Sequence, residues 1–365
     1  MTGRNSILRF MTVLVSALLL LSSCEYKDLC YDHDHTTASM KLNIDWSDIF
    51  ETPSGISLMF FPADGGDPIT VVSNSTESVD VALPEGEYNI LVFNQTVSEY
   101  ESVSFHNMDS WEDCYVELAD GVAPSWTTRA GNFSREPAEL MVGTVQNFGI
   151  TAYMIASSAT NPIVIELHPH PILLRTNVVL EVSGIQYARQ VRGVITGMAK
   201  RFYLTRNCTG PQTTGFSLPE WSIEQYKENA NNGAFKTDFI SFGVPNTYYN
   251  DTDLQHKSNY YKTTRASFNI TDPVYFDLDV LLVDNETIVS KSYQVSDRIV
   301  LSVDLLEIDV NVGIPFGEDG KPVADPQTNY PIELPHVDKP ESETGGGFSV
   351  SVQDWGEEEV HDVEL

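Results

Sequence analysis

Short apolar alternations separated by turn clusters recur along most of the chain, and they restrict the fold more than any other feature. Met40, Leu42 and Ile44 alternate with polar neighbours, as in a strand with one buried face. An apolar run over 56–61 then stops at a Pro- and Gly-rich turn over 62–68. Helical periodicity is scarce, so the sequence predicts a mainly β protein. Further candidate strands in this first part are 79–83, 87–93 and 115–118.

A second group of candidate strands follows a break at 121–138, where Pro124, Gly131 and Pro137 lie among small and polar residues. The regular spacing of strands and turns favours sandwiches, in which alternate side chains fill the space between two sheets. We therefore predict an N-terminal β domain at 39–130 and a C-terminal β domain at 136–312. The candidate strands of the second domain are 163–167, 175–182, 191–196, 235–242, 266–270, 274–283, 288–293 and 299–303.

Turn clusters and one ambiguous segment add detail to the predicted second domain. The clusters 231–233 and 284–286 are turns, and the second separates apolar runs that can pair as a hairpin. Residues 187–198 suit either a short helix or a strand.

The composition of the chain changes after residue 312. Residues 313–346 are rich in Pro, Gly and acids, which predicts an extended, poorly ordered segment. Alternation returns within 347–365, a predicted strand followed by an acidic tail. Such a terminal strand can pair with its own sheet or with that of a neighbour. Its candidate pairing residues are Phe348, Val350, Val352 and Trp355.

The first 23 residues predict a lipoprotein signal peptide. Arg4 and Arg9 precede an apolar run at 10–21, which is shorter than the ~18 apolar residues that a membrane span requires. Ser23 supplies the small residue before Cys24, so we expect cleavage between them and a lipid on Cys24. The alternative is an ordinary secretory signal that contains a cysteine. Residues 24–38 form a polar tether. Its residues 25–28 resemble the export signal of surface lipoproteins, and this resemblance implies that the lipid anchors the protein in the outer membrane, facing the exterior.

The charge balance excludes one class of partner. The chain has 52 acidic and 21 basic residues and a formal net charge of −31. Such a surface repels phosphate backbones, so nucleic-acid binding is excluded, as is adsorption to anionic lipid through a basic patch.

No motif indicates catalysis. The sequence contains no H-E-x-x-H, no G-x-S-x-G and no Gly-rich phosphate loop after a strand. We therefore assign no catalytic residue, no cofactor and no metal. The histidines of 32–35 and 168–171 could chelate a divalent ion, but we interpret these segments as a solvated spacer and an extended turn.

The cysteines of the mature chain are few. After Cys24 only Cys30, Cys114 and Cys208 remain, so at most one intramolecular disulfide can form. We interpret Cys114 and Cys208 as small buried hydrophobic residues.

Aromatic residues offer a candidate ligand contact. Tyr248, Tyr249, Tyr260 and Tyr261 lie in a polar stretch, 246–264, that reads as a long loop. We interpret Trp46 and Trp355 as strand residues packed in cores. Because aromatic faces can stack on sugar rings, a carbohydrate-binding lipoprotein that captures glycans is the alternative function.

Four segments together resemble the fimbrillin-like lipoproteins of Bacteroidota, and specifically a two-domain subfamily of unknown function. They are 29–33, 42–46, 83–94 and 278–285. Residues 25–28 also resemble the export signal of surface lipoproteins in that group. The resemblance implies two transthyretin-like β-sandwich domains in tandem and a role in pili or surface adhesion.

Pilus-forming members of that group lose their first strand. A protease cuts after an Arg, and a strand from another subunit fills the groove by strand addition. Here no Arg occurs between Cys24 and Thr128, and Arg129 lies at the end of the predicted N-terminal domain. Cutting after Arg129 would therefore discard that domain rather than open a groove.

We expect a non-enzymatic, lipid-anchored surface protein that keeps its first strand. It would act in cell adhesion, or as an anchor or minor fimbrial component, by β-strand complementation. Its partners would be outer-membrane lipid through Cys24, and other fimbrial subunits or host or bacterial surface ligands.

Overall fold

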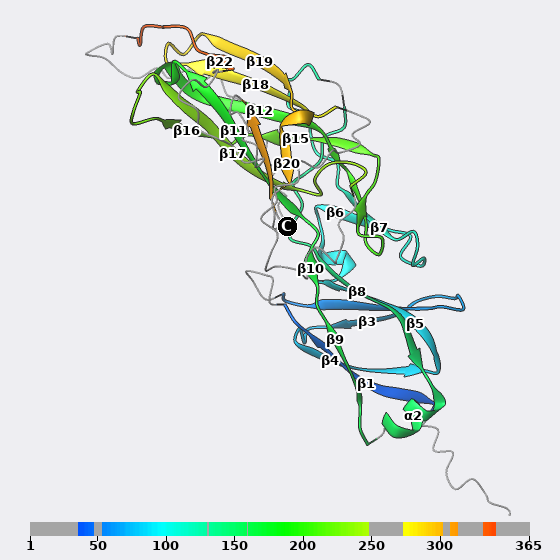
Figure 1. Ribbon diagram of the computed structural model, residues 1–365. Helices are drawn as coiled ribbons and strands as arrows, with labels where there is room; N and C mark the ends of the chain where they lie inside the picture. The colour runs from blue at the N-terminus through cyan, green and yellow to red at the C-terminus, as the bar shows by residue number, and fades with distance from the viewer. Residues whose placement is uncertain are drawn as a thin grey trace, which may run out of the picture.

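Strands dominate the structure. The computed structural model describes residues 36–46, 53–129, 131–158, 160–247, 273–301, 307–312 and 331–340. The strands form two sandwiches arranged end to end, with a smaller sheet between them (Figure 1). The mainly β prediction is therefore confirmed.

The first sandwich consists of a three-stranded sheet, order β4-β1-β9, and a five-stranded sheet, order β10-β8-β5-β2-β3. A short helix, α2 (Ala152–Ser158), lies beside β1 at the outer end of this sandwich (Figure 1). The strands are β1 (Thr37–Ile44), β2 (Ile56–Pro62), β3 (Ile69–Ser73), β4 (Ser78–Pro84), β5 (Gly86–Asn94), β8 (Met141–Ile150), β9 (Ile163–Leu167) and β10 (His170–Pro171).

The second sandwich pairs a sheet of order β16-β17-β11-β21-β20, in which β22 also pairs with β11, with a sheet of order β15-β12-β18-β19. Its strands are β11 (Leu174–Ser183), β12 (Ala188–Ala199), β15 (Thr213–Leu218), β16 (Ser222–Gln225), β17 (Asn232–Ser241), β18 (Tyr275–Leu282), β19 (Ile288–Gln294), β20 (Ile299–Leu301), β21 (Glu307–Val312) and β22 (Ile332–Glu333).

The smaller sheet has the order β14-β13-β7-β6. Its strands are β6 (Val103–His106), β7 (Tyr115–Leu118), β13 (Arg201–Tyr203) and β14 (Cys208–Thr209). Short 3₁₀ helices occupy Val97–Glu99, Ile185–Tyr187 and Ser296–Arg298.

The centre of the five-stranded sheet is buried on both faces. Residues 56–61 of β2 are all buried, and all of them except Ser57 are apolar rather than alternating. Leu58 and Phe60 point into the core of the first sandwich. Met59 and Phe61 point the other way, into a core that continues through the small sheet into the second sandwich. Phe61 meets Trp111 edge-on with ring centroids 5.5 Å apart. One sheet thus belongs to both cores and couples the two sandwiches.

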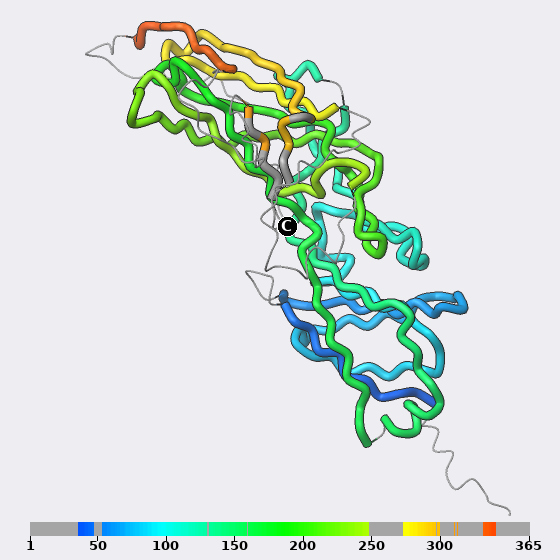
Figure 2. Tube along the Cα trace, viewed as in Figure 1, coloured from blue at the N-terminus to red at the C-terminus, as the bar shows by residue number. Residues whose placement is uncertain are grey.

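The predicted division at residues 39–130 and 136–312 is corrected by the strand pairing. β8 and β10 extend the sheet of β2 and β5, and β9 pairs in parallel with β1. β7, expected to complete the first domain, pairs with β13 instead. The chain crosses between sandwiches after β10, in the green run from β9 to β11 (Figure 2). The break at 121–138 marks a surface loop rather than a domain boundary.

The structure also tests the predicted turn, the ambiguous segment at 187–198 and the segment at 313–346. The turn at 284–286 joins β18 and β19 into an antiparallel hairpin, as predicted, and residues 187–198 form strand rather than helix. Part of the segment expected to be poorly ordered is structured, because Ile332 is fully buried and β22 pairs with β11. The candidate strand 266–270 lies outside the described residues.

Predicted core residues are confirmed where they can be examined. Trp46 is buried, and its indole N–H donates to the Thr76 carbonyl at 2.7 Å. Cys114 and Cys208 are buried free thiols. Among the residues that the structure describes, no helix is both long and apolar enough to cross a bilayer.

Candidate functional site

The first strand lies in the middle of its sheet. β1 pairs antiparallel with β4 on one side and parallel with β9 on the other. Its apolar positions Ala38, Met40 and Leu42 are fully buried and Ile44 is 6% exposed. This is the burial that the alternation of 40–44 predicts.

Hydrogen bonds also fix both ends of β1. At its start, the Ser39 amide donates to Ser158 Oγ of α2 at 2.9 Å. At its end, the Ile44 amide donates to the Glu77 carbonyl at 2.9 Å, and the Asp45 amide donates to the Leu167 carbonyl at 2.8 Å. β1 is therefore held along both edges and at both termini by its own chain.

Removing β1 would leave two open sheet edges. β4 and β9 would each lose a hydrogen-bonded partner, and the core of the first sandwich would be exposed between them. Unpaired strand edges are templates for another chain. The geometry therefore defines a latent strand-acceptor groove that the protein fills with its own first strand.

Arg129, the first arginine after the predicted signal peptide, lies on a closed surface loop, residues 121–133. The loop is closed by hydrogen bonds from the Gly121 amide to the Phe133 carbonyl at 2.8 Å and from the Arg135 amide to the Ala119 carbonyl at 3.1 Å. A Cβ on Gly121 would lie 2.8 Å from the Ser134 carbonyl carbon, so this close approach requires glycine.

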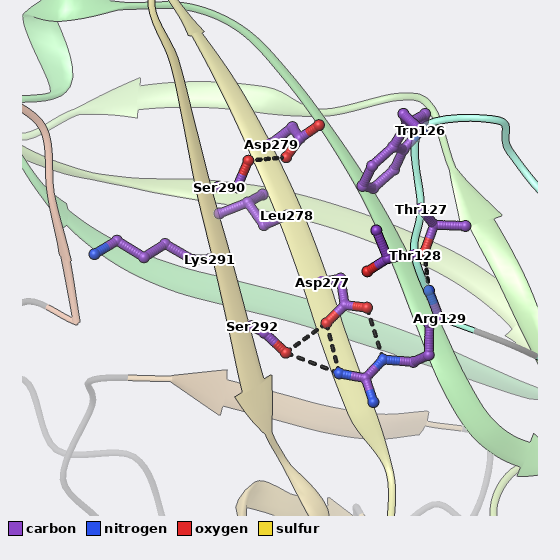
Figure 3. A pocket seen from close by; sticks show the side chains of 10 residues that line it. All are labelled: Trp126, Thr127, Thr128, Arg129, Asp277, Leu278, Asp279, Ser290, Lys291 and Ser292. Atoms are coloured by element: carbon purple, nitrogen blue, oxygen red, sulfur yellow. Dashed lines mark hydrogen bonds and ion pairs between the residues drawn. The ribbon is translucent and has the colours of Figure 1, made fainter.

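The Arg129 side chain is clamped on the outer face of the β18–β19 hairpin (Figure 3). Its Nε and Nη2 donate to the two oxygens of Asp277 at 2.6 and 2.8 Å, and Nη2 also donates to Ser292 Oγ at 2.8 Å. The guanidinium carbon lies 4.0 Å from the centroid of the Tyr275 ring. Bidentate pairing and ring stacking together fix both the position and the plane of the guanidinium.

The electrostatics of this clamp follow from its contacts. Burial opposes ionisation of Asp277, but hydrogen bonds from Arg129 and Ser292 outweigh it, so the pKa of Asp277 lies below its usual value. The hydrogen bond with Asp277 correspondingly raises the pKa of Arg129. Both groups are therefore ionised at neutral pH.

The structure corrects the expected consequence of a cut after Arg129. Such a cut would not discard a whole domain, because β8 and β9 lie after it and pair with β5 and β1, which lie before it. The two pieces would stay associated through these ladders. The clamp also keeps the Arg129 side chain only 25% exposed, which withholds it from a protease pocket.

All of the site residues predicted from sequence lie outside the described residues. These are Ser23, Cys24, the four tyrosines Tyr248, Tyr249, Tyr260 and Tyr261, and the terminal-strand residues Phe348, Val350, Val352 and Trp355. Their roles stay predictions.

The clamp partners were missed by sequence reasoning. Asp277 and Asp279 alternate with the buried residues Phe276, Leu278 and Val280, so period-two spacing places both acids on the outer face. Nothing in the sequence pairs these acids with a loop near residue 129.

Comparison with known proteins identifies a family model and a full-length relative. Residues 23–217 match the family model described as a domain of unknown function, DUF5119. A Bacteroides ovatus protein named "Putative fimbrium anchoring subunit Fim4B" is 24% identical, and the alignment covers 97% of this chain and 96% of that protein.

Solved structures give a similar picture. A "putative adhesin" from Bacteroides ovatus has a TM-score of 0.52 and 16% identity, covering 85% of this chain and 95% of that one. The fimbrial anchor protein Mfa2 from Porphyromonas gingivalis has a TM-score of 0.45 and 8% identity, covering 75% and 90%.

The two sandwiches, with the first strand at the centre of its sheet, have the same overall fold as the Bacteroides ovatus adhesin structure. The chain belongs to the DUF5119 family, whose model matches more than half of it.

Proposed function

We propose that this protein is a non-enzymatic cell-surface component of a fimbrial adhesion system. It is held in the outer membrane by a lipid on Cys24, and it acts as an anchor or stand-alone unit rather than as a polymerising stalk subunit. The full-length similarity to a protein named as a fimbrium anchoring subunit supports the fimbrial part of the proposal.

The central position of β1 is the observation that carries the proposal. A stalk subunit of the strand-exchange type must lose its first strand to expose a groove. Here β1 is paired on both edges, no Arg lies between Cys24 and Thr128, and Arg129 is clamped. Retention of β1 also preserves the covalent connection between the first sandwich and the predicted lipid.

Partner contact through strand addition stays part of the proposal. The donor would be the C-terminal alternation at Phe348, Val350, Val352 and Trp355. Deleting residues 346–365 should abolish higher-order assembly with other fimbrial subunits, and unchanged assembly would exclude this donor role.

The anchor role is tested in the bacterium by Cys24→Ala, with Cys30→Ala as the matched control. If Cys24 carries the anchor, Cys24→Ala should release the protein and any attached fimbriae into the medium, whereas Cys30→Ala should keep both on cells. Equal retention by the two variants would contradict the proposal.

A further inference from the structure

The loop at 121–133 leaves a cleft between itself and the outer face of the β18–β19 hairpin (Figure 3). Its volume is about 450 Å³, within the range of about 300–1,000 Å³ that is typical of ligand pockets. Ten residues line it, from Trp126 to Arg129 on the loop and from strands β18 and β19.

The floor of the cleft carries two parallel rows of polar groups. Asp277 lies opposite Ser292 and Asp279 opposite Ser290 in the hairpin register. Each serine hydroxyl donates to its aspartate at 2.6 Å. Since residues two apart on a strand share a face, both rows point toward the loop.

Each row ends at an arginine. Asp277 binds Arg129 from the loop, and Asp279 accepts from Nη2 of Arg192, on the neighbouring strand β12, at 3.0 Å. These guanidinium groups hold the carboxylates in place before any ligand arrives.

The polar groups keep hydrogen-bonding capacity. Ser290 and Ser292 donate to carboxylates, so each hydroxyl oxygen still has a lone pair, and both serines are exposed. Nη1 of Arg129 is engaged by neither Asp277 nor Ser292. The floor therefore offers acceptors and at least one donor at fixed positions.

Trp126 forms the aromatic end of the cleft, beside the row of Asp279 and Ser290 (Figure 3). The Arg192 guanidinium carbon lies 4.6 Å from the centroid of its ring, which fixes the indole while leaving it partly exposed. An aromatic surface beside a grid of carboxylate and hydroxyl groups suits a ligand with both apolar C–H faces and many hydroxyl groups.

We infer that this cleft binds a neutral saccharide built from hexose or N-acetylhexosamine units. The serine hydroxyls accept from sugar hydroxyls, Nη1 of Arg129 donates to a sugar oxygen, and Trp126 covers a C–H face of the ring. An acidic sugar is disfavoured, because it would approach two carboxylates on a protein of net charge −31. This activity does not depend on the anchor role.

The test measures binding of the full chain to albumin carrying α-mannose, β-galactose or β-N-acetylglucosamine, by biolayer interferometry. We expect binding to at least one probe and a loss of about tenfold or more in affinity for Trp126→Ala. The control Tyr153→Ala removes an aromatic side chain that is 80% exposed on α2, away from the cleft, and should bind normally.

A second variant separates loss of contact from loosening of the loop. Ser290→Tyr fills the cleft from an exposed strand position and leaves Trp126 in place, and it should also abolish binding. It removes the hydrogen bond to Asp279, so a cooperative thermal unfolding transition, at a somewhat lower temperature than in the wild type, shows that the variant is folded. Failure of the wild type to bind any of the three probes would overturn the inference. So would normal binding by Ser290→Tyr, whatever the effect of Trp126→Ala.

Discussion

A chain that begins at residue 53, and so lacks β1, should lose the cooperative folding of its first sandwich. β1 withdraws Met40, Leu42 and Ile44 almost completely from water. Burying each such side chain stabilises the fold by about 1.5–3 kcal/mol, so the three contribute roughly 5–9 kcal/mol. A domain is stable by only about 5–15 kcal/mol in total, so deleting β1 removes most of that margin.

Differential scanning calorimetry and urea unfolding measure this loss directly. The control is a chain that begins at residue 36 and retains β1. The shortened chain should lose the unfolding transition of the first sandwich and bind a hydrophobic dye such as ANS, because the core between β4 and β9 is exposed.

A peptide of residues 36–46 should restore the missing transition, because it supplies both ladders and the buried side chains in trans. A shortened chain whose transitions match those of the control, with or without the peptide, would refute the argument that β1 is integral to the fold.

Three further predictions concern the clamp and the thiols. Asp277→Asn should lower the free energy of unfolding in urea by about 1–3 kcal/mol, which is less than for a fully buried ion pair because Arg129 is 25% exposed. The same variant should be cleaved faster by trypsin after Arg129. An unchanged cleavage rate would contradict the clamp. The pKa of Asp277 is lower in the folded protein than in the unfolded chain, so the ionised carboxylate stabilises the fold above about pH 4, and this stabilisation is lost as the pH falls through the folded pKa. The difference in unfolding free energy between the wild type and Asp277→Asn should therefore shrink between pH 5 and pH 2. A difference that stays constant over this range would count against the ion pair. Burial raises the pKa of the Cys114 and Cys208 thiols, so fewer reactive thiolates form in the folded protein. Iodoacetamide at pH 8 should therefore label both cysteines more than tenfold faster in urea than in the native protein. Fast labelling of the native protein would show instead that the two thiols are accessible.

The alternation of apolar and polar residues predicted strands well where one face of the strand packs against a core. The alternation at 40–44 and at 288–293 appears in β1 and β19 because period-two burial is a local property. β8 was missed: the exposed polar residues Gln146 and Asn147 in its middle interrupt the apolar pattern.

The domain boundary and the partners of Arg129 could not be predicted from the sequence, because both depend on contacts between residues far apart in the chain. β9 joins β1 although they lie far apart in the chain, and the domain boundary depends on that pairing. The Arg129 clamp likewise joins a loop to Asp277 and Ser292, which are separated from it by most of the second sandwich. Residue type identified Arg129 as unusual, but its partners follow only from the tertiary structure.

The N-terminus of the mature protein shows whether the first strand is retained. The measurement is intact mass and N-terminal sequencing of the protein recovered from the surface of cells. We predict a full-length mature chain that begins with a lipidated Cys24. A chain that begins anywhere within residues 42–60, without lipid and without β1, would contradict it and identify a polymerising subunit.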